Sequence, residues 1–241
     1  MSDLRVIDSD LAEPYYTAAL DNAILSARGK GLVPDTLHLY RRTRPTVSLG
    51  YFQDLERTVD TELASQQGIC LVRRASGGSS IYTDQGQMIF GLVLSGDEVP
   101  EAPIDSYPLL CEGVVLALKR FGLNAEWKPL NDVLVGGRKI SGSAQTRKHG
   151  AVLHQGTILV DTDLELMAKV LRPREGHVDK GVGGMTTMRR ELGRDVPIGE
   201  VKDALIEGFS EALGKRPYRS YVTEQENEEV KGFLKGAYCS K

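Results

Sequence analysis

The chain has 241 residues, of which 41% are hydrophobic, 26% charged and 6% aromatic, an apolar content that excludes a wholly disordered protein. Thirty basic and 33 acidic residues give a formal net charge of −3, which disfavours general binding to the phosphate backbone of nucleic acids. Three widely spaced cysteines, Cys70, Cys111 and Cys239, indicate a reducing cytoplasm rather than a disulfide framework. No signal peptide and no apolar run of about 20 residues is visible, so we expect a cytoplasmic protein with neither nucleic-acid nor membrane partners.

Four stretches predict helices, because apolar residues recur at helical spacing and a glycine or a capping pattern marks one end. They cover residues 14–28, 105–121 and 198–213, with a fourth helix that begins near Thr223. The fourth opens with Thr223-Glu224-Gln225-Glu226, the pattern of a capping box.

Six runs rich in Val, Ile, Leu and Thr predict strands, bounded by Gly, Pro or Asp. They cover residues 36–40, 46–50, 69–73, 87–94, 132–135 and 151–161. Strands follow one another without a helix after each, which favours a mixed, largely antiparallel sheet over a doubly wound parallel one. The sequence therefore predicts an α+β (mixed α/β) fold, as one domain over residues 1–241.

Residues 73–84 read RRASGGSSIYTD and join a strand to a loop of small residues. Small residues let a ligand approach the main chain, where N–H groups can hold a carboxylate or phosphate oxygen. The arginine pair, Arg73 and Arg74, adds charge that persists at neutral pH. An ordinary surface turn with solvated arginines would give the same pattern.

Residues 131–145 read NDVLVGGRKISGSAQ, which predicts a strand, a Gly-Gly turn and a second strand. Lys139 stands beside the small residues 141–144, so its ammonium can point at whatever fills the space they leave open. A solvated lysine on an exposed strand is the alternative. Asp132 is a candidate metal or ribose contact, or a simple turn residue.

Other reactive side chains carry weaker signals. We expect His154 and His38 to be hydrogen-bonded histidines of the core or a strand edge. Cys111 falls on the apolar stripe of a helix, so we expect it to be a buried packing residue. Residues 183–187 read as a loop with no legible chemistry.

Taken together and in this order, these segments resemble the lipoate–protein ligase A family, one of the biotin and lipoate attachment enzymes. The family pattern is Arg-Arg-x-Ser-Gly-Gly-Gly and a later Asp, then Asn-Asp and Gly-x-Lys-Ile-x-Gly-x-Ala. The matching residues are Arg73, Arg74, Ser76, Gly77, Gly78, Asp84, Asn131, Asp132, Gly137, Lys139, Ile140, Gly142 and Ala144. The resemblance runs from about residue 15 to residue 235.

The resemblance implies a fold like that of class II aminoacyl-tRNA synthetases and biotin synthetases. It implies that lipoate reacts with ATP to give lipoyl-AMP, with Mg²⁺ as the usual partner of ATP. It also implies transfer of the lipoyl group to a lysine of an acceptor, a lipoyl domain of a 2-oxoacid dehydrogenase E2 component or a glycine cleavage H protein.

The resemblance assigns the central role to Lys139, which is expected to contact the acyl carbonyl and the α-phosphate. The other residues expected to bind lipoate or ATP are Arg74, Gly77, Gly78, Ser79, Ser80, Ile81, Tyr82, Asp84, Asn131, Asp132, Ser141 and Gly142. Asp132 is also the candidate ligand of Mg²⁺.

The chain departs from the family pattern in three ways. Ser79 stands where a third glycine is usual, and Thr83 where a histidine is frequent. Larger members carry a small C-terminal accessory domain, whereas this sequence stops soon after its fourth helix. We therefore expect a catalytic domain that works with a separate small accessory subunit.

Two other functions fit the same segments. An octanoyl- or lipoyl-transferase of the superfamily would move the acyl group through a cysteine thioester. Its nucleophile is expected near residues 129–132 or 170–185, where this sequence has no cysteine. A non-catalytic module that binds lipoate or an adenylate is the other alternative.

Overall fold

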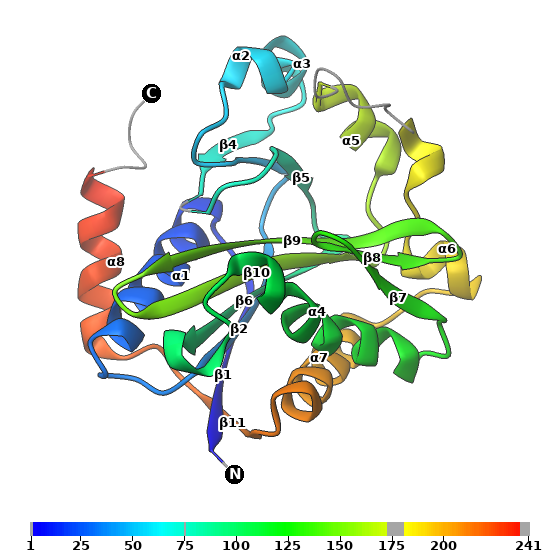
Figure 1. The fold of residues 1–241 in the computed structure, drawn as a ribbon. Coiled ribbons are helices and arrows are strands. Elements are labelled where there is room, and N and C mark those ends of the chain that lie inside the picture. Colours follow the sequence, from blue (N-terminus) through cyan, green and yellow to red (C-terminus); the bar gives the residue numbers. More distant parts are fainter. Residues whose placement is uncertain (1, 75, 173–180, 237–241) are drawn as a thin grey trace.

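The computed structural model describes residues 2–74, 76–172 and 181–236, and a large sheet runs through its middle (Figure 1). Its strand order is β11-β1-β2-β6-β10-β9-β8-β7, with β11, β1 and β2 parallel and every other neighbouring pair antiparallel. The strands are β1 (Asp3–Ala12), β2 (Thr36–Arg42), β6 (Gln87–Ser95), β7 (Ala125–Lys128), β8 (Asp132–Val135), β9 (Arg138–Lys148), β10 (Ala151–Leu159) and β11 (Arg216–Ser220). The predicted α+β fold with a mixed, mostly antiparallel sheet is confirmed.

A second, three-stranded sheet lies above the first in Figure 1, in the order β4-β3-β5. Its strands are β3 (Thr46–Leu49), β4 (Cys70–Arg73) and β5 (Ile81–Thr83). The helices α2 (Leu55–Thr58), α3 (Thr61–Gln66) and α5 (Leu164–Val170) accompany it. Val47, Tyr82 and Met167 belong to one apolar cluster with Leu159 of the large sheet, which joins the two sheets.

Two pairs of helices cover the two faces of the large sheet (Figure 1). On one face lie α4 (Pro103–Arg120) and α7 (Ile198–Leu213), and on the other α1 (Pro14–Gly29) and α8 (Glu224–Gly236). Gly113 and Gly208 allow α4 and α7 to touch, since a Cβ at Gly208 would lie 2.3 Å from the carbonyl oxygen of Gly113. The short helix α6 (Met188–Leu192) precedes α7. No helix among the residues described is long and apolar enough to span a membrane.

The start of α8 is tied to the N-terminal strand. Thr223 and Glu226 form the predicted capping box, in which the amide of Thr223 donates to Glu226 Oε2 (2.8 Å) and the amide of Glu226 to Thr223 Oγ1 (3.2 Å). The same carboxylate pairs with Arg5 of β1, and both side chains are buried. Burial alone would raise the pKa of Glu226, but hydrogen bonds from Arg5 and Thr223 lower it below its usual value.

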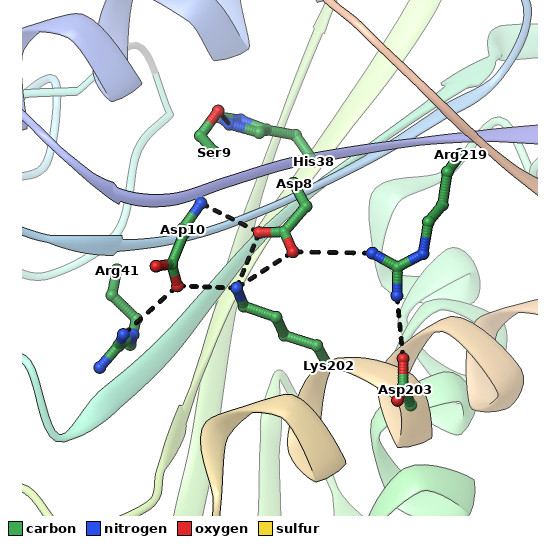
Figure 2. A network of polar contacts seen from close by, with 8 residues as sticks. All are labelled: Asp8, Ser9, Asp10, His38, Arg41, Lys202, Asp203 and Arg219. Carbon is green, nitrogen blue, oxygen red and sulfur yellow. Dashed lines mark hydrogen bonds and ion pairs between the residues drawn. The ribbon is translucent and has the colours of Figure 1, made fainter.

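An ion network fastens β1 to α7 and β11 at a bulge in β1 (Figure 2). The ammonium of Lys202 in α7 lies 2.9 Å from Asp8 Oδ1 and 2.7 Å from Asp10 Oδ1. Arg219 of β11 bridges Asp8 and Asp203 at 3.7 and 3.0 Å. These contacts explain how a strand with three acidic residues, counting Asp3, lies inside a sheet.

The predicted elements and the observed ones agree in the long, periodic segments. The four predicted helices are α1, α4, α7 and α8, and the six predicted strands are β2, β3, β4, β6, β8 and β10. The second strand of the predicted Gly-Gly hairpin is β9. Sequence reasoning did not find β1, β5, β7, β11 or the short helices α2, α3, α5 and α6. These elements are short or polar, and neighbouring segments rather than their own apolar pattern stabilise them.

Candidate active site

A cavity of about 620 Å³ opens between the segment that follows β4 and the hairpin of β8 and β9. Most of the predicted site residues line it: Arg74, Gly78, Ser79, Ser80, Ile81, Tyr82, Asn131, Asp132, Lys139, Ser141 and Gly142. Gly77 and Asp84 are not among the residues that line it. Two segments about fifty residues apart in sequence therefore face one space.

Lys139 is positioned by two neighbours on its hairpin. Its ammonium lies 2.6 Å from Asp132 Oδ1, and its side chain is 38% exposed. A Cβ at Gly142 would lie 2.7 Å from both Cε and Nζ of Lys139, so the end of the lysine rests on the backbone of Gly142. The glycine three residues after the lysine thus provides space for the cation.

Arg74 is buried and organises the loop that follows it. Its Nε donates to Ser76 Oγ (3.0 Å), Nη1 to the carbonyl of Ser48 (2.8 Å), and Nη2 to the carbonyls of Gly77 (2.6 Å) and Ser79 (2.7 Å). Four of the five N–H groups of a guanidinium are thereby used within the protein. Burial lowers the pKa of Arg74 to about 10, and the group stays charged at neutral pH.

Arg73 supports the turn after β3, which packs against that loop. Its Nη1 donates to the carbonyls of Gly50 (3.1 Å), Tyr51 (3.1 Å) and Gln53 (2.8 Å). Gly50 is required here, since a Cβ would lie 2.0 Å from the carbonyl oxygen of Gly78. Gly78 itself has a φ of +86°, a conformation that favours glycine.

A chain of buried hydrogen bonds leads from α1 to this loop. The carboxylate of Asp21 lies 2.8 Å from His38 Nδ1 and accepts from the Tyr40 hydroxyl (3.0 Å) and from Gln155 Nε2 (2.5 Å). Ser76 donates to Gln155 Oε1 at 2.8 Å. The expectation that His38 is hydrogen-bonded is confirmed, whereas Asp21 was not recognised, although an aspartate amid the apolar run of α1 was a signal.

Asp84 has a structural role in this arrangement. Its Oδ1 accepts from the amide of Gly86 (2.9 Å) and its Oδ2 from the amide of Asp163 (3.0 Å), at the start of α5. Burial raises its pKa above the usual value. Both carboxylate oxygens therefore serve the backbone.

Asp132 is the one carboxylate among the cavity residues that the structure describes. In the described ranges no group of three or more His, Cys, Asp or Glu could hold a metal by protein ligands alone. Mg²⁺ bound to a nucleotide takes most of its ligands from phosphate and water and needs only one or two carboxylates. Asp132 fits that more limited role.

The segment 183–187, which showed no chemistry in the sequence, contacts the lysine directly. Met185 lines the cavity and pairs with Lys139 in an isolated bridge. The amide of Thr186 donates to the carbonyl of Lys139 at 2.9 Å. Residues 185–187 thus form a loop, as expected, and this loop fixes the backbone at Lys139.

No cysteine is among the described residues that line the cavity. Cys111 is buried, as expected, with Sγ 3.8 Å from Ser143 Oγ, and burial raises its thiol pKa to about 11. Cys70 is half-buried on β4, and Cys239 lies outside the residues described.

His154 differs from its predicted state. It is fully buried near the rings of Phe90 and Tyr107, with centroids 5.8 and 5.9 Å away. Neither ring nitrogen has a hydrogen-bond partner among the described residues, so the expectation of a hydrogen-bonded core histidine was wrong. Burial lowers its pKa to about 3, and the ring is neutral at physiological pH.

Comparison with known sequences identifies two kinds of relative. An octanoyltransferase LipM of Symbiobacterium thermophilum is 30% identical, over 97% of this chain and 95% of the relative. Lipoate-protein ligase A subunit 1 of Thermoplasma acidophilum is 34% identical, over 92% of this chain and 88% of the relative.

Solved structures agree with the sequence comparison. A bi-partite lipoate protein ligase from T. acidophilum, studied with its E2 lipoyl domain, has a TM-score of 0.88 and 30% identity, with 100% of this chain and 95% of that chain covered. A lipoate-protein ligase A bound with ATP has a TM-score of 0.86 and 29% identity, with 100% and 96% covered. A second T. acidophilum structure, with bound lipoic acid, has a TM-score of 0.85 and 30% identity, with 98% and 95% covered.

The family described as the lipoyl protein ligase A/B catalytic domain matches residues 13–210. That match spans both of the segments that build the cavity. The chain is therefore an enzyme of the lipoyl protein ligase A/B catalytic domain family.

Proposed function

We propose that this chain is an ATP-dependent lipoate–protein ligase, which activates lipoate as lipoyl-AMP and transfers the lipoyl group to a lysine of a lipoyl-domain acceptor. The observation that carries this proposal is the cavity wall, which presents Lys139 and, among the described residues, no cysteine. A cation that is held in a fixed position reduces the repulsion between two anions, here lipoate and ATP, as they react. Transfer through a thioester needs a thiolate instead.

In the first step, a carboxylate oxygen of lipoate attacks the α-phosphorus of ATP, and the bond from that phosphorus to the leaving pyrophosphate breaks. Both reactants are anions, so their approach is opposed by Coulomb repulsion. Lys139 offsets this repulsion from a position that Gly142 and Asp132 fix in advance. Mg²⁺ supplies further positive charge to the phosphates when bound, and Asp132 with Asn131 would hold it.

In the second step, the neutral amine of the acceptor lysine attacks the acyl carbonyl of lipoyl-AMP. The carbon–oxygen bond to AMP then breaks, and an amide and AMP are formed. Lys139 donates a hydrogen bond to the oxygen that becomes negative during this attack. The T. acidophilum relative, which is paired with an E2 lipoyl domain, supports an acceptor of that class.

The direct test is to incubate the purified chain with lipoate, ATP, Mg²⁺ and a lipoyl domain, and to measure the intact mass of the domain. We expect a mass gain of one lipoyl group that depends on ATP, with AMP as the by-product, and that is slow for the chain alone but fast from synthetic lipoyl-AMP. A lipoyl domain that is modified only from an octanoyl carrier protein, without ATP, would contradict the proposal. Binding of lipoate and ATP with no product under any condition would indicate a non-catalytic module.

We also infer that a separate small subunit assists the adenylation step. The relative named lipoate-protein ligase A subunit 1, and the description of its enzyme as bi-partite, support this. The chain alone is then expected to transfer the lipoyl group from synthetic lipoyl-AMP but to use free lipoate and ATP slowly. Multiple turnovers from lipoate and ATP with no second protein would exclude the two-subunit arrangement.

The similarity to LipM supports an octanoyltransferase as the second candidate. Cys111 lies next to the cavity wall, since its Sγ is 3.8 Å from Oγ of the cavity residue Ser143. With a thiol pKa near 11, few molecules carry the thiolate at neutral pH. Cys111→Ala is therefore expected to keep lipoyl transfer, and loss of all transfer would favour the thioester route. Cytoplasmic location and a single domain over residues 1–241 stay predictions.

A further inference from the structure

A second cation faces the cavity, and the steps above do not use it. Arg42, the last residue of β2, lines the cavity and is only 3% exposed. Its Nε and Nη1 are buried and have no hydrogen-bond partner among the residues described. A guanidinium that is removed from water with two of its three nitrogens unpaired is costly, so a site that keeps one is adapted to a ligand that pairs with these nitrogens.

The protein offers Arg42 no counter-ion within the cavity. Asp132 is the carboxylate among the described cavity residues, and its Oδ1 already pairs with Lys139. Arg74 is a second buried cation nearby, and its N–H groups already donate to oxygens of Ser48 and of the loop that follows Arg74. The charge of Arg42 adds to burial in lowering the pKa of Arg74, which places the two guanidinium groups close enough to repel.

Arg42 and Lys139 lie at different ends of the cavity. Arg42 ends β2 and Lys139 is near the start of β9, and β6 and β10 lie between these strands. Three strand spacings separate the two backbones, or about 14 Å. An acyl group whose carboxyl end is at Lys139, and whose chain crosses the cavity over β10 and β6, places its far end near Arg42.

We propose that Arg42 makes this far end selective for acyl chains that terminate in a hydrogen-bond acceptor, and so for lipoate over octanoate. The inference rests on the proposed function, because it assumes that the carboxyl end of the acyl group lies at Lys139. A terminal methyl group would exclude water from Nε and Nη1 of Arg42 and would give these nitrogens no hydrogen-bond partner. The sulfurs of a dithiolane are weak acceptors, and a terminal carboxylate is a strong one.

The neighbouring Arg41 provides a matched control. It carries the same charge on the same strand but does not line the cavity. Its Nη2 donates to Asp10 (3.3 Å, Figure 2) and its Nη1 to the carbonyl of Gln85 (3.5 Å), and its Nε is buried without a partner among the described residues. Replacing either arginine with methionine removes one charge and keeps similar side-chain bulk. Only the change at Arg42 alters the cavity wall.

The test measures dissociation constants by calorimetry with non-hydrolysable acyl-sulfamoyl-adenosine analogues, whose adenosine end fixes the direction of the acyl chain. Three chains are compared: octanoyl, lipoyl and the mono-acyl derivative of octanedioate, which ends in a carboxylate. For the wild type we expect the octanedioate derivative to bind about 10-fold or more tightly than the octanoyl one, with lipoyl between them. Arg42→Met should abolish or invert this order, and Arg41→Met should preserve it.

The outcomes of this experiment distinguish a failure of the proposed function from a failure of the role proposed for Arg42. A wild type that binds none of the three analogues contradicts the proposed function. A wild type that binds all three but shows no preference for an acceptor at the chain end overturns the role of Arg42, whatever the variants do. Equal weakening of all three by Arg42→Met overturns it as well, since the arginine would then serve the adenylate end or the fold. Arg42→Gln, with thermal unfolding of each variant, distinguishes lost charge from lost structure.

Discussion

The ammonium of Lys139 and the carboxylate of Asp132 form an ion pair of 2.6 Å across the hairpin of β8 and β9. Both side chains are partly open to solvent, at 38% and 30%, so the pair adds little to stability. The main effect of the pair is to hold the ammonium of Lys139 in place at the cavity wall. Because its removal should cost the fold little, the role that we propose for Lys139 in the reaction can be tested by substitution.

Lys139→Ala is expected to abolish lipoyl transfer and leave the fold intact. Loss of one preorganised charge at a developing oxyanion costs about 10² to 10³ in rate. Single-turnover transfer from lipoyl-AMP and thermal unfolding are the measurements. Arg138→Ala is the control, since Arg138 is the adjacent cation and pairs with Glu191 at the surface. A Lys139→Ala enzyme with near-normal single-turnover rates would remove the lysine from the mechanism.

Gly142→Ala is expected to reduce activity without unfolding the protein. The new Cβ would lie 2.7 Å from the end of the Lys139 side chain, which can move, so the lysine is displaced while the backbone stays. A displacement of about 1 Å at a reacting group costs on the order of 10²-fold in rate. Gly199→Ala on α7, where a Cβ meets nothing within 4 Å, is the matched control. Equal activity of the two variants would show that the lysine needs no such space.

Arg74→Lys is expected to weaken lipoate binding by about 10-fold or more and to lower the melting temperature, whereas Arg73→Lys should have a small effect. Arg74 uses three different nitrogens to reach four oxygens, an arrangement that a single ammonium cannot reproduce. Arg73 reaches its three carbonyls through the two N–H groups of Nη1 alone, and a lysine ammonium, with three N–H groups, can replace them. Similar, mild effects at both positions would support an ordinary surface turn.

His154 is expected to make the protein acid-sensitive. Burial lowers its pKa to about 3 in the folded state, while the unfolded state keeps about 6.5. The unfolded state therefore binds more protons between these values, and stability falls as the pH decreases below about 6.5. From pH 7.5 to 5.5 this histidine should account for a loss of about 1.4 kcal/mol.

His154→Leu should remove that part of the pH dependence of unfolding measured in denaturant. The exposed His149 provides the control, because His149→Gln is expected to leave the acid sensitivity unchanged. If His154→Leu has the same pH profile as the wild type, the histidine gains a proton or a partner that the structure does not show.

The sequence predicted the centre of the fold and of the site because local patterns encode them. Helices such as α7 carry an apolar stripe of their own, and its predicted bounds match the observed ones. Lys139 and the loop after Arg74 were found because small residues next to a cation are visible in the sequence.

What the sequence could not show depends on contacts between distant segments. β1 contains Asp8 and Asp10, which read as loop residues until Lys202 of α7 pairs with them (Figure 2). Arg42 resembles its neighbour Arg41 in the sequence, and only the cavity that the folded chain forms shows which of them faces it. Asp84 matched the family pattern, yet one of the two amides that it accepts from belongs to Asp163, the N-cap residue of α5 far along the chain.

The ion pair of Arg5 and Glu226 also bears on the order in which the protein can fold. Arg5 leaves the ribosome early, but its buried partner is synthesised 221 residues later. Until then the guanidinium has Thr36 and solvent as its partners, so β1 cannot reach its final buried state during synthesis. The last helix thus completes the first strand, and a nascent chain that stops before α8 should remain susceptible to proteases at its N-terminus.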